Sequence, residues 1–137
     1  MKNMKILTTA VLCLLLSFSM GATAMAESIT SPDGQLKLDF SVNAQGEPVY
    51  ELSYKGKGVI KPSKLGLELK NDPGLMNGFA CIDTKTSTFD ETWEPVWGEV
   101  KSIRNHYNEM AVNLINEDQV QLTLRFRVFN DGVGFRY

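Results

Sequence analysis

The stretch VQLTLRFRV, residues 120–128, has the longest strict alternation of apolar and polar residues in the chain. Successive side chains of a β-strand point to opposite faces of a sheet, so a period of two places one set in a core and the other in solvent. The same period recurs in shorter segments, at residues 36–42, 50–54, 65–69 and 110–114. We therefore expect each of these segments to be a strand with one buried face.

Turn-forming residues separate these segments. They stand at SPDG (31–34), QGEP (45–48), KGKG (55–58), NDPG (71–74) and NDG (130–132). Glycine allows a positive φ, proline presets φ, and Asn or Asp hydrogen-bonds its own backbone, so these groups favour tight turns. Short strands joined by turns are typical of an antiparallel β-sandwich or barrel. The prediction is an all-β fold, an antiparallel β-sandwich.

Composition limits the class of protein. The chain has 137 residues, of which 43% are hydrophobic and 22% charged, with a formal net charge of −2. The apolar content excludes a disordered polar tail, and the lack of a cationic excess excludes a basic nucleic-acid binder. The last segment, GVGFRY (132–137), begins another alternating strand and stops without a polar tail. We expect one domain at most, truncated at its C-terminal end.

The N-terminal segment has the parts of a secretory signal peptide. Lys2 and Lys5 precede an apolar run over residues 6–20, and ATAMA (22–26) supplies small residues for cleavage after Ala26. The apolar run is shorter than the roughly 20 residues of a spanning helix. The sequence therefore predicts a signal peptide at 1–26, an exported domain at 27–137 that is periplasmic or secreted, and no membrane attachment after cleavage.

Cleavage would leave Cys81 as the only cysteine of the exported chain. No intrachain disulfide is then possible, and the core must supply the stability of the fold. Cys81 lies in the apolar stretch FACI (79–82), which predicts a small buried thiol. With a single histidine in the chain, no Cys and His cluster of the kind that binds zinc is expected.

One segment, FDETWEPVWGEVKSIRNHYNE at residues 89–109, lacks the alternation and predicts an extended or turning loop. It holds both tryptophans and the only histidine, and Pro95 between the tryptophans argues against a helix. Flat rings suit sugar faces and polar groups suit sugar hydroxyls, so a loop of this composition is a candidate sugar contact. The candidate contact residues are Trp93, Trp97, Arg104 and His106.

Structural interpretations of the same residues stand beside this one. Tryptophans of a sandwich usually cover an end of the core, and a histidine is more often packed and hydrogen-bonded than a ligand. Arg104 can pair with Glu99 or Asp90 as a strut, or present its planar guanidinium to a ligand. The acids of the loop show neither a rigidly held catalytic pair nor the spacing of a calcium loop. No catalytic, cofactor-binding or metal-binding residue is therefore assigned.

The motif DETWEPVWGE (90–99), followed by IRNHYNE (103–109), resembles the N-terminal domain of glycoside hydrolase family 97. Three flanking segments agree in order and spacing: SPDG (31–34), PSKLGL (62–67) and FRVFNDGVGFRY (126–137). The chain is similar in particular to the exported bacterial α-glucosidases of starch utilisation within that family.

The resemblance implies a part of a three-domain enzyme. It would comprise an N-terminal β-super-sandwich, a catalytic (β/α)8 barrel and a small C-terminal β-domain, cleave α-glucosides or α-galactosides, and use calcium at the active site. Because the catalytic and calcium residues of the family lie beyond this chain, we expect a domain that is inactive alone and packs on the barrel to shape its active site. Its partners would be that barrel and, through it, an α-linked oligosaccharide.

Two other functions stay open at this point. The first is a free-standing carbohydrate-binding module in which Trp93, Trp97 and His106 form a sugar platform. The second is a purely structural docking domain whose aromatic loop is buried against a partner. Both fit an all-β scaffold, because the fold alone does not determine the function.

Overall fold

The computed structural model describes residues 26–70 and 74–137. The predicted signal peptide lies outside these residues except for Ala26, and so does most of the predicted 71–74 turn. The described residues contain no helix, and hence none that could cross a membrane. They form eight strands: β1 (Ala26–Thr30), β2 (Leu36–Val42), β3 (Pro48–Tyr54), β4 (Lys57–Lys64), β5 (Ala80–Trp93), β6 (Ile103–Ile115), β7 (Gln121–Val128) and β8 (Val133–Arg136).

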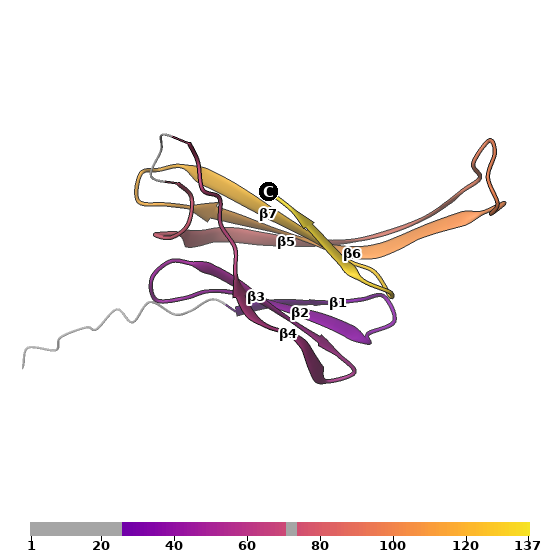
Figure 1. The fold of residues 1–137 in the computed structure, drawn as a ribbon, viewed down its shortest axis with the longest axis horizontal. Coiled ribbons are helices and arrows are strands. Elements are labelled where there is room, and N and C mark those ends of the chain that lie inside the picture. Colours follow the sequence, from indigo (N-terminus) through magenta and orange to yellow (C-terminus); the bar gives the residue numbers. More distant parts are fainter. Residues whose placement is uncertain (1–25, 71–73) are drawn as a thin grey trace, which may run out of the picture.

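The strands make two antiparallel sheets of four, each in simple chain order. The first is β1-β2-β3-β4 and the second is β5-β6-β7-β8. The two sheets lie face to face as the layers of a sandwich (Figure 1). The predicted all-β antiparallel β-sandwich is confirmed, and so is the final strand that begins at Val133.

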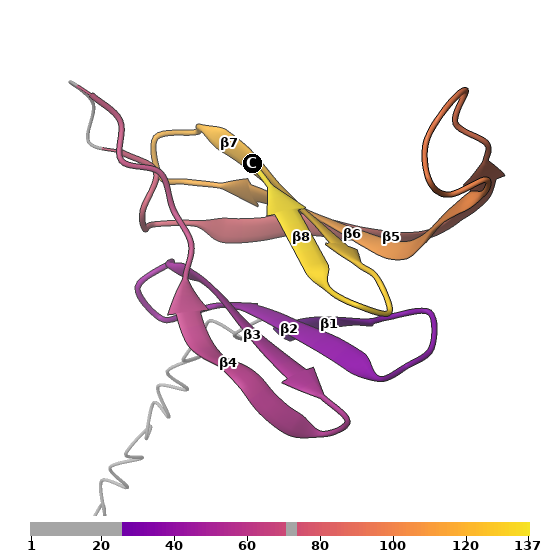
Figure 2. The same cartoon turned by 45° about the vertical axis from the view of Figure 1, so that its right-hand side comes forward.

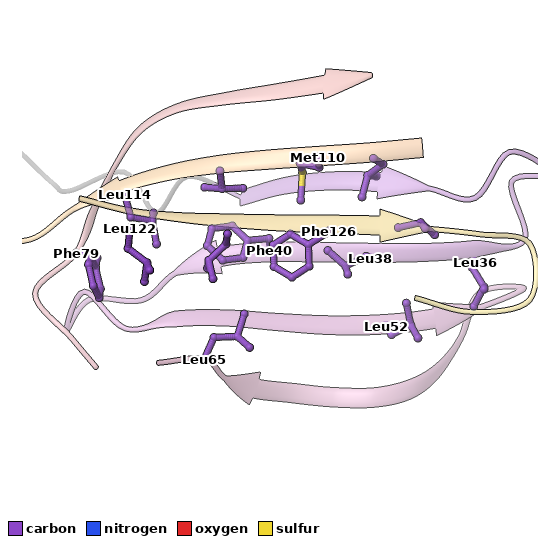
Figure 3. Packing of buried hydrophobic residues seen from close by; sticks show 14 residues of the cluster. Leu36, Leu38, Phe40, Leu52, Leu65, Phe79, Met110, Leu114, Leu122 and Phe126 are labelled. Atoms are coloured by element: carbon purple, nitrogen blue, oxygen red, sulfur yellow. The ribbon is translucent and has the colours of Figure 1, made fainter. Parts of the chain in front are cut away.

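The core lies between the sheets and is built by the alternating faces that the sequence marks. Phe40 of β2 and Phe126 of β7 meet at its centre, with ring centroids 5.7 Å apart (Figure 3). Around them lie the other inward residues of the ladders, chiefly Leu36, Leu38, Leu52, Met110, Val112, Leu114, Leu122, Leu124 and Val128. The predicted buried face of residues 120–128 is correct except at its first residue, because Val120 precedes the strand and is exposed.

The predicted strand at residues 65–69 is wrong. β4 ends at Lys64, and the following residues carry the chain from the first sheet to the second. Leu65 is buried against the core, but Leu67 makes only an isolated bridge with Leu75, and Leu69 is exposed. An extended crossover with one side on the core produces the same alternation as a strand, which explains the error.

The turn between β2 and β3 holds the end of this crossover. Gly46 in that turn has φ +72°, and its carbonyl accepts a hydrogen bond from the backbone N–H of Phe79 at 2.9 Å. The N–H of Gly78 donates to the carbonyl of Gln45 at 3.1 Å. These two bonds place the buried ring of Phe79 at the edge of the core, directly before β5 begins.

Cys81 is only partly buried. The prediction that its thiol packs as a small apolar group is correct, but the prediction that it is fully buried is not. Its side chain packs against the core, and its Sγ lies 3.7 Å from both the Asp83 carbonyl and the Thr84 hydroxyl. The neighbouring Ile82 points away from the core and is exposed.

The hairpin of β5 and β6 extends beyond the sandwich. β6 pairs with β7 only from Asn108 onward, so residues 103–107 pair with β5 alone. We call residues 89–107 the arm; Figures 1 and 2 show it projecting past both sheets. The predicted loop at 89–109 is therefore wrong for most of its length, because only residues 94–102 lie outside the strands. Beyond Tyr107, at residues 90–93 and 103–106, neither face of the hairpin is covered by the other sheet, and the side chains are exposed or half-buried. This removes the apolar alternation that identifies a strand with one buried face.

Candidate functional site

The strand register divides the arm into two faces. Residues directly opposite each other in an antiparallel pair share a face, and neighbours along a strand do not. Asp90 lies opposite His106, and Thr92 opposite Arg104. These pairs form what we call the polar face: Asp90, Thr92, Arg104 and His106. The opposite face, which we call the aromatic face, is formed mainly by Phe89, Trp93, Ile103 and Tyr107.

An ion pair organises the polar face. The Arg104 guanidinium donates through Nε to Asp90 Oδ1 at 2.8 Å and through Nη2 to Oδ2 at 2.6 Å. This bond and the positive charge of Arg104 lower the pKa of Asp90, and the carboxylate in turn raises the pKa of Arg104. His106 Nε2 lies 4.0 Å from the same Oδ2. Of the two partners predicted for Arg104, the structure selects Asp90.

Both tryptophans are exposed, so the prediction that they cover an end of the core is wrong. Trp97 lies in the loop at the tip of the arm and is 90% exposed, and Trp93 at the end of β5 is 48% exposed. Two valines of the same loop, Val96 and Val100, are exposed as well. We call residues 94–102 the tip loop. The arm carries this apolar group away from the sandwich.

The four candidate residues share the arm but not one surface. Arg104 and His106 lie on the polar face, Trp93 on the aromatic face, and Trp97 in the tip loop. A single sugar platform that combines Trp93 with His106 is therefore not formed. Contact of any of these residues with a substrate stays a prediction.

The base of the arm holds a cluster that sequence reasoning missed. Tyr107 is buried between the rings of Phe89 and Phe129, with centroids 5.2 and 5.1 Å away, and Arg127 Cζ lies 4.6 Å from its ring centroid. Glu109, two residues further along β6, is buried and accepts hydrogen bonds from Arg125 at 2.5 Å and Arg127 at 2.7 Å. The sequence did contain a hint of this cluster. Arg125 and Arg127 lie on the polar side of the 120–128 segment, and two neighbouring cations favour a carboxylate on the adjacent strand.

Glu109→Gln is expected to change the acid stability of the domain. Burial raises the pKa of Glu109, but hydrogen bonds from Arg127 and Arg125 outweigh burial, and the net shift is downward. Such a carboxylate stabilises the fold above its ordinary pKa of 4.5, and this contribution is lost as pH falls through the lower folded value. We expect the variant to lose about 1–3 kcal/mol at pH 7, because both arginines lose their charged partner.

Urea unfolding at pH 7 and at pH 3 measures this effect. The difference in unfolding free energy between wild type and Glu109→Gln should be smaller at pH 3 than at pH 7. Below 4.5 the carboxyl of the unfolded wild-type chain binds a proton that the folded carboxylate, with its lowered pKa, binds less readily, so the stabilisation by the carboxylate declines. Glu51→Gln is the matched control, because Glu51 is an exposed carboxylate on a strand and should behave as wild type. A difference that stays constant between the two pH values would contradict the assignment.

The family described as Glycosyl-hydrolase 97 N-terminal matches residues 29–137. The chain belongs to this family. The match covers every strand after β1, which it enters at Ile29, and it includes the whole arm.

Relatives of this family 97 N-terminal domain are much longer proteins. A retaining alpha-galactosidase of Bacteroides thetaiotaomicron is 27% identical over 134 residues, which is 98% of this chain and 19% of that protein. A glycoside hydrolase family 97 enzyme of Pseudoalteromonas sp. strain K8, in complex with acarbose, aligns with a TM-score of 0.76 and 33% identity over 81% of this chain and 17% of its own. A beta-arabinopyranosidase aligns with a TM-score of 0.72 and 26% identity over 80% of this chain and 17% of its own.

The carboxylates of this family 97 domain do not fit the calcium ion that the resemblance implies. Among the described residues, no three His, Cys, Asp or Glu side chains gather as a metal site would require. Asp90 is engaged by Arg104, and Glu109 by two arginines, so neither offers a free hard-oxygen ligand. Asp90 therefore pairs with Arg104 within the arm, and Glu109 pairs with arginines of β7 beside the base of the arm.

Proposed function

We propose that this domain packs on a catalytic barrel outside the 137 residues and shapes the rim of its active site. The observation that supports the proposal is the tip loop, in which Val96, Trp97 and Val100 are exposed at the end of a projecting hairpin. Contiguous exposed apolar side chains mark interaction surfaces, and the projecting hairpin places these at some distance from the sandwich. The docked enzyme would act on α-glucosides or α-galactosides and be exported, through the signal peptide at residues 1–26.

Hydrolysis would belong to the barrel and not to this chain. Glycoside hydrolysis needs two carboxyl groups on either side of the scissile bond, one of them able to donate a proton. Asp90 has a lowered pKa in its pair with Arg104, and the same holds for Glu109 between its arginines, so both are poor proton donors. Calcium would likewise be bound by residues of the barrel.

Two measurements test this proposal. The chain, supplied with calcium, should show no turnover of 4-nitrophenyl α-glucoside or α-galactoside. The reading frame beyond Tyr137 should continue into a barrel-forming sequence, and a protein expressed through that frame should hydrolyse one of the two substrates. Turnover by the chain alone, or a stop codon directly after Tyr137, would overturn the proposal.

A second candidate function, a free-standing carbohydrate-binding module, is favoured by one observation. Trp97 exposes nearly its whole indole, and aromatic faces of this kind can stack on sugar rings. The platform cannot include both Trp93 and His106, because they lie on opposite faces of the arm. Of the two tryptophans, Trp97 supplies the more open ring for stacking.

Trp97→Ala separates function from stability. Because the side chain is almost fully exposed, we expect the unfolding free energy to change by no more than about 0.5 kcal/mol. Under the docking proposal, calorimetric titration with maltooligosaccharides shows no binding that depends on Trp97. Binding that is lost in Trp97→Ala and kept in Trp97→Phe would instead establish the binding module.

A further inference from the structure

An open groove of 360 Å³ lies between β1 and β5, the edge strands that flank one side of the sandwich. Apart from Ile29, its lining residues are polar and uncharged: Ser28, Thr30, Thr86, Ser87, Thr88 and Asn108. A groove of this size falls within the range of small-molecule sites. Its lining offers hydroxyl and amide groups and no formal charge.

Hydrogen bonds fix the floor of the groove and leave its rim open. Thr88 donates to Asn108 Oδ1 at 2.8 Å, and Asn108 Nδ2 donates to the carbonyl of Thr30 at 2.9 Å, so Asn108 bridges the two sheets. Within the described part of the chain, the hydroxyls of Ser28 and Thr86 have no hydrogen-bond partner in the protein. These hydroxyls are available to a ligand.

The polar face of the arm follows the groove along the same face of the β5–β6 hairpin. Thr88 and Asn108 form one cross-strand pair, and the next pair on the same face is Asp90 with His106. Arg104 follows opposite Thr92. From Thr86 to Thr92 the strip is about 20 Å long, at about 3.3 Å per residue. We call the groove and the polar face together the polar strip.

The chemistry of the polar strip suits a neutral ligand with many hydroxyls. The charges of Asp90 and Arg104 balance each other, which disfavours a phosphate or a polyanion. The guanidinium uses two N–H groups on Asp90 and keeps others free to donate. The 4.0 Å between His106 Nε2 and Asp90 Oδ2 is too long for a hydrogen bond, and one bridging hydroxyl fits between them.

We propose that the polar strip binds an extended neutral oligosaccharide segment, and that Asp90 is the positioning residue that holds Arg104 against it. That the oligosaccharide is α-linked rests on the proposed function. The location of the binding site rests only on the groove and the polar face described above. The strip binds sugar through hydrogen bonds on the sandwich side of the arm, at a place separate from the indole of Trp97. The strip would hold a part of the oligosaccharide that is remote from the bond to be cleaved.

Titration of the purified chain with maltotriose, followed by amide NMR, tests this inference. We expect saturable shifts at Thr86, Asn108 and His106. Asp90→Asn should raise the dissociation constant about tenfold, because the neutral amide no longer fixes the guanidinium. Asp118→Asn, which changes an exposed acid in the turn between β6 and β7, is the matched control and should bind as wild type.

Each outcome decides between sites. Shifts confined to the tip loop would place the sugar at Trp97 and overturn the inference, as would no shifts at tens of millimolar maltotriose. Equal affinity in Asp90→Asn would overturn the positioning role. If that variant fails to fold by its amide spectrum, Thr86→Val removes a groove hydroxyl while keeping its shape, and weaker binding is again expected. The hydrolysis and reading-frame tests can fail without changing the result of this titration. The proposed docking function and the proposed sugar site can therefore be rejected independently of each other.

Discussion

Phe126→Ala is expected to lower the free energy of unfolding by about 3–5 kcal/mol. The ring is fully buried between the sheets, 5.7 Å from the ring of Phe40 and 6.1 Å from that of Phe135. Truncation removes the contacts of a whole aromatic ring and leaves a cavity that two hydrogen-bonded sheets close only in part. Since domains of this kind have about 5–15 kcal/mol in total, the loss is a large share of the stability.

Urea unfolding followed by circular dichroism measures the effect as a shift in the transition midpoint. Val59→Ala is the control, because Val59 is an apolar strand residue that is largely exposed and should change stability by no more than about 0.5 kcal/mol. A loss below about 1 kcal/mol for Phe126→Ala would show that the two sheets do not pack through this ring.

Gly46→Ala is expected to cost about 3 kcal/mol or more. The backbone at Gly46 has φ +72°, a region that side chains with a Cβ enter only with strain. An added Cβ would also lie 2.6 Å from the backbone nitrogen of Phe79 and 2.7 Å from the Cα of Gly78. Because both neighbours are backbone atoms, the crossover itself must move, which breaks the two hydrogen bonds that hold it to the turn.

Gly56→Ala isolates this contact. Gly56 has nearly the same φ, +76°, but no atom lies within 4 Å of an added Cβ. We expect it to cost only about 1–2 kcal/mol, from backbone strain alone. The difference between the two variants therefore measures how strongly the turn supports the crossover. Equal costs would mean that the crossover does not depend on Gly46.

The strands that sequence alone predicts are those with one buried face. Apolar and polar residues alternate in β2, β3, β7 and the second half of β6, because every second side chain of these strands packs into the core. β4, with the sequence KGVIKPSK, is an edge strand whose side chains are mostly exposed, so no period appears in it. Burial, and not strand formation itself, produces the pattern that can be recognised.

The arm escaped prediction for the same reason, and its faces depend on long-range register. Its strands carry exposed polar side chains on both faces, Asp90 and Thr92 on one and Glu91 on the other, so the sequence predicted a loop at residues 89–93. The motif DETWEPVWGE marked the family and the tip loop, but not which residues share a face. Arg104 pairs with Asp90 because the strand register brings together two residues that are 14 positions apart in the sequence. The local spacing of residues does not reveal that register.

The projecting hairpin also sets a rule for how the arm can change during evolution. Because side chains alternate along both strands, inserting one residue in each would exchange the two faces beyond that point, whereas inserting two in each would preserve them. The reach of the tip can therefore grow or shrink only in steps of about 7 Å if the chemistry of each side is to be kept. Homologues that differ in hairpin length should accordingly differ by even numbers of residues per strand.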